Sequence, residues 1–275
     1  MTLDNLIALR RTKRMVIKIG TSTIIKNINK VNISNLERIV RVISYLYNQG
    51  KEIVVVSSGA IGLGASKIGL KKKPKKLEDK QAMAAIGQGA LMHIYENIFT
   101  KYGITIAQML LTRSDLEDNF RSQNTQNTFN ALFKYKVIPI VNENDTIAVE
   151  EIVYGDNDTL SAVVSTLIKA DLLIMLSDTD GLYTGDPRTS KEVKKASLIK
   201  NIDKDIENFA CDTGSAFGTG GMKTKISAAK IATYQGAYVA IIKGEEPEQI
   251  INLVFGENKG TVFLPRGKKE VIWNG

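Results

Sequence analysis

The sequence has 275 residues, of which 43% are apolar and 24% are charged, and its net charge is +8. This is the composition of an ordinary globular protein, and the length allows one large α/β domain or two small ones. Its one cysteine, Cys211, and one histidine, His93, exclude a disulfide framework and a metal centre of His and Cys. Apolar runs such as Leu172–Leu176 are too short to span a bilayer. Because Met1–Arg14 also lacks the apolar core of a signal peptide, we expect a cytoplasmic protein.

Short runs rich in β-branched residues alternate along the chain with longer amphipathic runs. We predict strands at Met15–Ile19, Glu52–Ser57, Ile104–Leu110, Val137–Val141, Leu172–Leu176, Tyr238–Ile242 and Thr261–Leu264. The first six are nearly continuous in apolar residues, which is typical of parallel strands buried on both faces. We predict helices near Ser34–Asn48, Glu78–Tyr102, Arg121–Tyr135, Thr159–Ala170, Thr224–Gln235 and Pro247–Phe255. This alternation predicts an α/β fold, a three-layer αβα sandwich around a mainly parallel sheet.

Smaller signals refine this prediction. Gly50 and Gly103 lie where helix C-caps would fall before the next strand. Thr146–Tyr154 alternates between apolar and polar residues and favours a hairpin laid over the sheet. His93 lies within a helical pattern, so we interpret it as a helix-face residue. Because no shift of composition marks a domain boundary, we expect residues 1–275 to form a single domain.

Ligands of such sheets bind beyond the carboxyl ends of the strands. Several segments that would share this edge consist of small and polar residues. They are Lys18–Ser22, Ser57–Gly64, Asn142–Asp145, Gly155–Asp158 and Ser177–Gly181. One such ending is commonplace, but five on one edge predict a binding site.

The segment Gly218–Lys225 reads Gly-Thr-Gly-Gly-Met-Lys-Thr-Lys and leads into a helical pattern. Glycines let a backbone approach a ligand closely, and a helix N-terminus attracts anions. Lys223 and Lys225 would enter the first turn, where their charge opposes the helix dipole unless an anion binds. The segment therefore favours a phosphate site, and the alternative is a glycine-rich turn before a surface helix. It is not a P-loop, because the pattern Gly-x-x-x-x-Gly-Lys-Ser/Thr does not occur in the sequence.

Together these motifs resemble the amino acid kinase family, and within it the members that act on L-glutamate. The resemblance covers about residues 14–265 and rests on motifs in matching order: Val16–Ser22, Val56–Gly64, Gln108–Asp115, Val141–Asp145, Gly155–Ser161, Asp180–Arg188 and Gly218–Lys225. A single glycine follows Lys18-Ile19, where relatives acting on aspartate or acetylglutamate usually carry two. Ser177 stands where threonine is common. Many relatives add a C-terminal domain of RNA-binding type, and we expect only the kinase domain here.

The resemblance implies transfer of the γ-phosphoryl group of ATP to the side-chain carboxylate of L-glutamate, the first step of proline biosynthesis. That carboxylate is ionised at neutral pH and needs no general base. The obstacle is the approach of one anion to another, so fixed cations around the transferred group are the physical answer. As catalytic residues the resemblance implies Lys18 and Lys225, with Asp158 between the two ammonium groups.

The resemblance also implies the residues that bind each substrate. For glutamate these are Ser58, Asn142, Asp145, Asp156 and Asn157, with Asp145 as counter-ion of the ammonium group and with turn capping as the alternative role of Asp156. For ATP they are Lys18, Ser177, Asp178, Thr219, Gly220, Gly221, Met222, Lys223, Thr224 and Lys225. The part from about 14 to 170 would thus bind glutamate, and the part from about 171 to 265 would bind ATP. Mg²⁺ is expected to bind chiefly through the nucleotide phosphates, so no protein ligand of the metal is predicted.

Two alternatives stay open. The chain could be another member of the family, acting on acetylglutamate, aspartate, carbamate or a nucleoside monophosphate, or a non-catalytic regulator that binds nucleotide or RNA. The positive charge is concentrated in Lys71–Lys76, but no aromatic residues accompany it, so we expect a solvated loop and no nucleic-acid partner. The family implies a homo-oligomer and a transient partnership with glutamate-5-semialdehyde dehydrogenase, which would take up the labile acyl phosphate.

Overall fold

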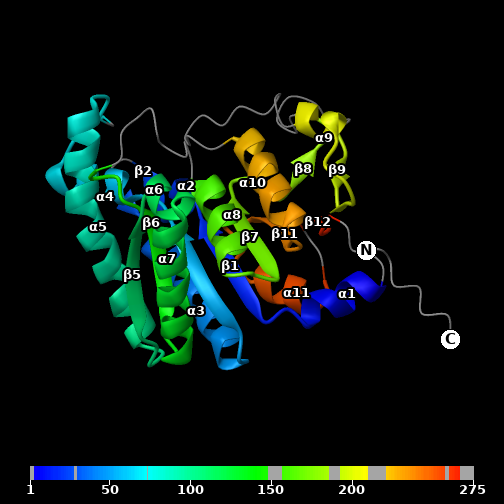
Figure 1. Ribbon diagram of the computed structural model, residues 1–275. Coiled ribbons are helices and arrows are strands. Elements are labelled where there is room, and N and C mark those ends of the chain that lie inside the picture. Colours follow the sequence, from blue (N-terminus) through cyan, green and yellow to red (C-terminus); the bar gives the residue numbers. More distant parts are fainter. Residues whose placement is uncertain are drawn as a thin grey trace.

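The structure is a computed structural model that describes residues 3–27, 30–72, 74–147, 157–185, 193–209, 221–257 and 260–266. An eight-stranded sheet forms its centre (Figure 1). The strands lie in the order β10 (Leu198–Ile199), β12 (Thr261–Phe263), β11 (Tyr238–Lys243), β7 (Leu172–Ser177), β1 (Arg14–Ile19), β4 (Glu52–Ser57), β6 (Ile138–Glu143) and β5 (Ile106–Leu111). From β11 to β5 all neighbours are parallel, whereas β12 is antiparallel to β11 and parallel to β10.

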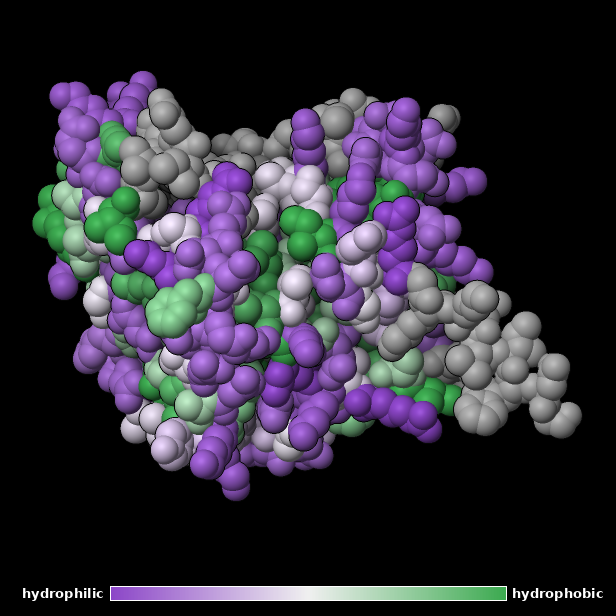
Figure 2. Space-filling view, in the orientation of Figure 1, coloured by the Kyte–Doolittle hydropathy of each residue, from purple (hydrophilic) through white to green (hydrophobic). Residues whose placement is uncertain are grey.

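Helices cover both faces of this sheet. One face carries α1 (Leu3–Arg10), α3 (Ile33–Asn48), α5 (Leu77–Thr100) and α11 (Gln249–Phe255), and the other carries α7 (Asn119–Lys134), α8 (Asn157–Leu167) and α10 (Met222–Tyr234). The shorter elements are α2 (Thr21–Ile24), α4 (Ala60–Ile68), α6 (Arg113–Glu117), α9 (Lys204–Phe209) and the antiparallel pairs β2 (Ile25–Asn27) with β3 (Lys30–Val31) and β8 (Leu182–Tyr183) with β9 (Lys195–Ala196). Figure 2 shows hydrophilic residues over much of the face that carries α7, with apolar and intermediate residues among them near α8.

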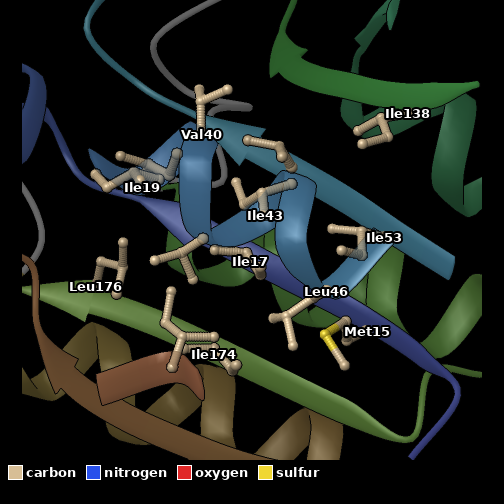
Figure 3. Packing of buried hydrophobic residues seen from close by; sticks show 14 of the residues in the cluster. Met15, Ile17, Ile19, Val40, Ile43, Leu46, Ile53, Ile138, Ile174 and Leu176 are labelled. Carbon is tan, nitrogen blue, oxygen red and sulfur yellow. The ribbon is translucent and has the colours of Figure 1, made fainter. Parts of the chain in front are cut away.

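Alternation along the strands divides the core into two layers. In β1, Met15, Ile17 and Ile19 belong to the cluster that includes α3, whereas Val16 belongs to the cluster that includes α8 and α10. Figure 3 shows Ile17 beside Ile43 of α3. Because both sides of each strand bury apolar residues, the strands read as continuous apolar runs in the sequence.

The three-layer αβα sandwich predicted from the sequence is confirmed. The predicted strands and helices occur close to their predicted bounds, and the helix predicted at Thr159–Ala170 ends at Leu167. Gly50 and Gly103 have φ angles of 80° and 66°, as their predicted capping positions require. His93 lies exposed on α5, as expected. In the described part of the chain, no helix has the length and apolar character that crossing a bilayer requires.

Five helices were not predicted from the sequence: α1, α2, α4, α6 and α9. Of these, α1 falls in the basic N-terminal segment, and α4 falls in a segment interpreted as the small, polar end of a strand. Gly62 and Gly64 lower the helix propensity of α4, so its pattern did not indicate a helix. The hairpin expected at Thr146–Tyr154 lies outside the described residues from 148 onward, as does Cys211.

Helices α4 and α5 touch backbone to backbone at two glycines. A Cβ atom added at Gly64 would lie 1.9 Å from the carbonyl oxygen of Met83, and one added at Gly87 would lie 1.8 Å from that of Ala60. Neither position therefore accepts a side chain unless the helices move apart. Because α4 begins three residues after β4 ends at Ser57, this contact fixes the end of β4 relative to α5.

Gly87→Ala should therefore destabilise the protein, whereas Gly89→Ala, on the exposed side of the same helix, should not. No heavy atom lies within 4 Å of a Cβ added at Gly89. Overpacking costs about 1–3 kcal/mol or more, while alanine in place of an unhindered helical glycine stabilises by about 0.5–1 kcal/mol. Urea unfolding of both variants measures the difference. Equal effects of the two substitutions would contradict the close helix contact.

Candidate active site

Lys18, Asp158 and Lys225 form a buried, ion-paired triad at the carboxyl ends of the parallel strands. Lys18 Nζ lies 2.6 Å from Asp158 Oδ1, and Lys225 Nζ lies 3.2 Å from Asp158 Oδ2. The side chain of Asp158 is 0% exposed, and those of the lysines are 5% and 7% exposed. Asp158 therefore lies between the two lysines, where the sequence analysis placed it.

Each member of the triad comes from a different element. Lys18 belongs to the central strand β1, Asp158 to the first turn of α8, and Lys225 to the first turn of α10. A carboxylate is favourable at a helix N-terminus, whereas a lysine there opposes the dipole. Asp158 offsets that repulsion, and Thr224 Oγ1 also donates a hydrogen bond of 2.9 Å to Asp158 Oδ2. Two ammonium groups against one carboxylate leave the triad with a net positive charge, which attracts an anion.

On one side of the triad, β4, β6 and α8 bring together a group of amides and hydroxyls. The Nδ2 atom of Asn157 lies 2.7 Å from the carbonyl oxygen of Ser57, 2.9 Å from Ser58 Oγ and 2.9 Å from Asn142 Oδ1. Because Ser58 Oγ accepts from Asn157, its own proton can be donated to a ligand. Three of the residues expected to bind substrate, Ser58, Asn142 and Asn157, are thus in direct contact.

Two carboxylates follow the same strand end. Glu143 and Asp145 are both half-buried, and within the described residues no basic side chain forms an ion pair with either. Burial raises the pKa of Asp145 to about 6. Burial and the negative charge of Asp145 raise the pKa of Glu143 to about 7. Two partly desolvated carboxylates without a cation form a site that a ligand ammonium group would satisfy.

On the other side of the triad, β7 and β11 end at the same edge. Ser177 Oγ donates a hydrogen bond of 3.0 Å to Asp178 Oδ1, and the backbone N–H of Gly244 donates one of 2.7 Å to the carbonyl oxygen of Ser177. Ser177 is buried and Asp178 is exposed. A Cβ at Gly20, which follows β1, would lie 3.7 Å from Lys18 Nζ, so the backbone here runs close to the triad.

The glycine-rich segment is described only from Gly221 onward. Gly221 is the N-cap of α10, and Met222, Lys223 and Thr224 form its first turn with Lys225, as predicted. Thr219 and Gly220 lie outside the described residues, as does Asp156 among the expected substrate residues.

Sequence reasoning missed three residues of this site. Glu143 lies in the motif Val141–Asp145, but no role was predicted for it. The residue types of a motif do not reveal which carboxylates lose their water on folding. Ser57 and Gln88 were missed because a lone serine or glutamine carries no signal of its own. Gln88 Oε1 accepts a hydrogen bond of 2.9 Å from Asn142 Nδ2.

The arrangement suits a reaction that brings two anions together. The cationic triad lies at the centre of the sheet edge, with amides, hydroxyls and carboxylates on the β4–β6 side and a helix N-terminus on the side of α10. Among the described residues, no group of three or more His, Cys, Asp or Glu side chains is placed to hold a metal ion. A magnesium ion carried by nucleotide phosphates and water requires no such group.

Comparison with known proteins identifies relatives over nearly the whole chain. A model of the amino acid kinase family matches residues 13–243. Glutamate 5-kinase of Clostridium acetobutylicum is 50% identical over 260 residues, which cover 94% of this chain and 97% of that protein. Glutamate 5-kinase of Clostridium perfringens is 49% identical over 263 residues, with 94% and 98% covered. The structure of carbamate kinase from Giardia lamblia bound to AMP-PNP shares the fold, with a TM-score of 0.62 and 17% identity over 93% of this chain and 99% of that one.

Asp158→Ala should destabilise the protein by about 3–5 kcal/mol, because it leaves two buried ammonium groups without their carboxylate. The triple variant Lys18→Met, Asp158→Leu, Lys225→Met should lose less, since it leaves no unpaired charge. Asp205→Asn, at an exposed position of α9, is the control and should change stability by less than about 0.5 kcal/mol. Urea unfolding measures all three. A loss for Asp158→Ala no larger than that of the control would show that the pairing is energetically unimportant.

Proposed function

The chain belongs to the amino acid kinase family, and from this premise we propose that it transfers the γ-phosphoryl group of ATP to the side-chain carboxylate of L-glutamate. Identity of about half over nearly the full length of two glutamate 5-kinases supports this function. The geometric observation that carries it is the cationic triad beside two half-buried carboxylates on one sheet edge. Phosphorylation of glutamate in this way is the first step of proline biosynthesis.

The two carboxylates favour an acceptor that carries a free ammonium group. We propose that Asp145 and Glu143 hold the ammonium group of glutamate, while Ser58 and Asn157 orient a carboxylate of the same molecule. An acetylated amino acid or a carbamate would offer no cation, and the two carboxylates would lose their water without compensation. Aspartate has the ammonium group but is one methylene shorter, so only activity measurements separate it from glutamate.

In the transfer step, the chain supplies positioning and charge. Lys18 and Lys225 would contact phosphate oxygens from opposite sides and stabilise the charge that spreads over the transferred group. Asp158 fixes both ammonium groups, and its carboxylate is not required as a base because the acceptor is already ionised. ATP would occupy the part from about 171 to 265, against Ser177, Asp178 and the start of α10, and glutamate the part from about 14 to 170. Mg²⁺ would enter with the nucleotide and neutralise phosphate charge.

Three expectations from the sequence and the family stay predictions. They are a cytoplasmic location, a homo-oligomeric state and a transient partnership with glutamate-5-semialdehyde dehydrogenase, which would take over the labile acyl phosphate.

The proposed activity is tested by trapping the product with hydroxylamine. An acyl phosphate reacts with hydroxylamine to a coloured hydroxamate, so we expect a signal that requires ATP and L-glutamate together. Aspartate and acetylglutamate, offered at the same concentration, are the controls and should give little product. A hydroxamate formed only with one of these two would move the function to another reaction of the family.

Lys18→Ala and Lys225→Ala should each lower kcat about a hundredfold to a thousandfold, with smaller changes in KM. The reason is that charge on the transferred group grows chiefly in the transition state, where one well-placed donor has an effect of this size. Lys→Arg should not restore full activity, because a planar guanidinium does not fit a site occupied by a compact ammonium group. Steady-state kinetics with both substrates varied measures the effect. Changes confined to KM would assign the lysines to ground-state binding alone.

The KM for glutamate should rise as the pH falls from 8 to 6. The raised pKa values of about 7 for Glu143 and about 6 for Asp145 mean that both carboxylates take up protons in this range and lose their attraction for an ammonium group. The sign for stability is opposite: the ligand-free protein should lose stability as the pH rises through the same range, and glutamate should offset that loss. The KM for ATP is the internal control and should change less.

Asp145→Ala should raise the KM for glutamate roughly tenfold to a hundredfold, the effect of losing a charged hydrogen bond of about 1.5–3 kcal/mol. The same variant should leave the KM for ATP nearly unchanged. Equal effects on both substrates would assign Asp145 a structural role instead.

A further inference from the structure

Gln88 is a buried polar residue on α5 that lies outside the motifs on which the resemblance to the family rests. It is 8% exposed, on a helix that otherwise contributes apolar side chains to the core. Among the described residues, its side chain forms one hydrogen bond with the candidate site, which its Oε1 atom accepts from Asn142 Nδ2. Its Nε2 atom is buried and has no hydrogen-bond partner among the described residues.

Two backbone groups fix the orientation of all the amides in this network. The N–H of Glu143 donates a hydrogen bond of 2.9 Å to Asn142, so the accepting atom must be the oxygen Oδ1. The other end of the Asn142 amide is then a donor, and its partner on Gln88 must be the oxygen Oε1. At the far end, the carbonyl of Ser57 accepts from Asn157, so the Asn157 atom in contact must be Nδ2. No amide in the network can therefore be turned over without loss of a bond.

The network forms a continuous path from α5 to the start of α8. Gln88 holds Asn142, Asn142 Oδ1 accepts from Asn157 Nδ2, and the same nitrogen reaches Ser58 Oγ. Asn157 directly precedes Asp158, so this path ends at the triad. Because Gly87, the neighbour of Gln88, lies against Ala60 of α4, the helix that carries Gln88 is held firmly at this point.

The buried Nε2 atom indicates that Gln88 is not there to maximise stability. A buried donor without a partner costs about 1–3 kcal/mol, and an apolar side chain of the same shape would avoid that cost. The stability gained from the single bond to Asn142 is of similar size or smaller. The residue therefore makes little net contribution to folding, and its contribution lies in the orientation of Asn142.

We propose that Gln88 is a positioning residue for the acceptor substrate: it fixes Asn142, and through Asn142 the amide of Asn157 and the hydroxyl of Ser58 that face the acceptor. This inference rests on the proposed function, in which these groups bind glutamate. Because the path lies on the β4–β6 side of the triad, loss of Gln88 affects the acceptor and leaves the nucleotide side unchanged.

The test is Gln88→Met, which keeps the size of the side chain and removes its polar atoms. We expect the KM for glutamate to rise about tenfold, with the KM for ATP within about twofold of the parent. The melting temperature should stay close to that of the parent. The substitution removes the unsatisfied donor Gln88 Nε2 but leaves Asn142 Nδ2 without its acceptor, and these two effects offset each other. Glu96→Gln, an exposed position on the same helix, is the matched control and should leave both KM values unchanged. If the methionine variant folds poorly, Gln88→Asn, which withdraws the oxygen by one methylene, repeats the test.

A double-mutant cycle shows whether Gln88 acts through Asn142. In an Asn142→Ala background, Gln88→Met should have little further effect on the KM for glutamate. An effect as large as in the parent background, or an equal rise of both KM values, would overturn the proposal. Failure of the proposed function is seen separately, because the parent protein would then give no glutamate-dependent hydroxamate. In that case the same double-mutant cycle is run with the acceptor that the parent does phosphorylate. The same outcomes then decide whether Gln88 positions the acceptor through Asn142.

Discussion

The carboxylate of Asp158, held between Lys18 and Lys225, is the interaction on which the site depends. Buried charges are stable only when they are paired, and here one buried carboxylate pairs with two ammonium groups from separate elements. The remaining positive charge is what an incoming phosphate can neutralise. The same contact therefore joins β1, α8 and α10 in the free protein and presents two oriented cations to an anionic ligand.

In the proposed reaction, the two ligands would bind on either side of this contact. Lys18 lies on β1, between β4 and β7, and the parallel register aligns Ile19 with Ser57 on one side and with Leu176 on the other. The groups proposed to bind the acceptor lie at the ends of β4 and β6, while Ser177 ends β7. Because all these strands are parallel, their ends share one edge, and a phosphoryl group transferred between the two ligands would pass over β1.

Most of the fold could be predicted from the sequence, because parallel strands buried on both faces leave continuous apolar runs. The place of Asp158 between two lysines followed from resemblance to a known family, and no pattern in the sequence alone would have located it. Features that depend on contacts between distant segments could not be predicted. The approach of Gly64 to Gly87 is one example, since each glycine alone only weakens a helix pattern. The raised pKa of Glu143 is another, because it depends on how much water that carboxylate loses on folding.

In the proposed transfer, Asp158 acts through the lysines, as one unit with them. The most direct test is a double-mutant cycle on kcat with Lys18→Ala and Asp158→Asn, after confirming that each variant is folded. We expect the double variant to lose much less activity than the product of the two single losses, because once Lys18 is absent the carboxylate has less left to orient. Losses that multiply fully would show that Asp158 and Lys18 contribute independently, and would contradict this role of Asp158.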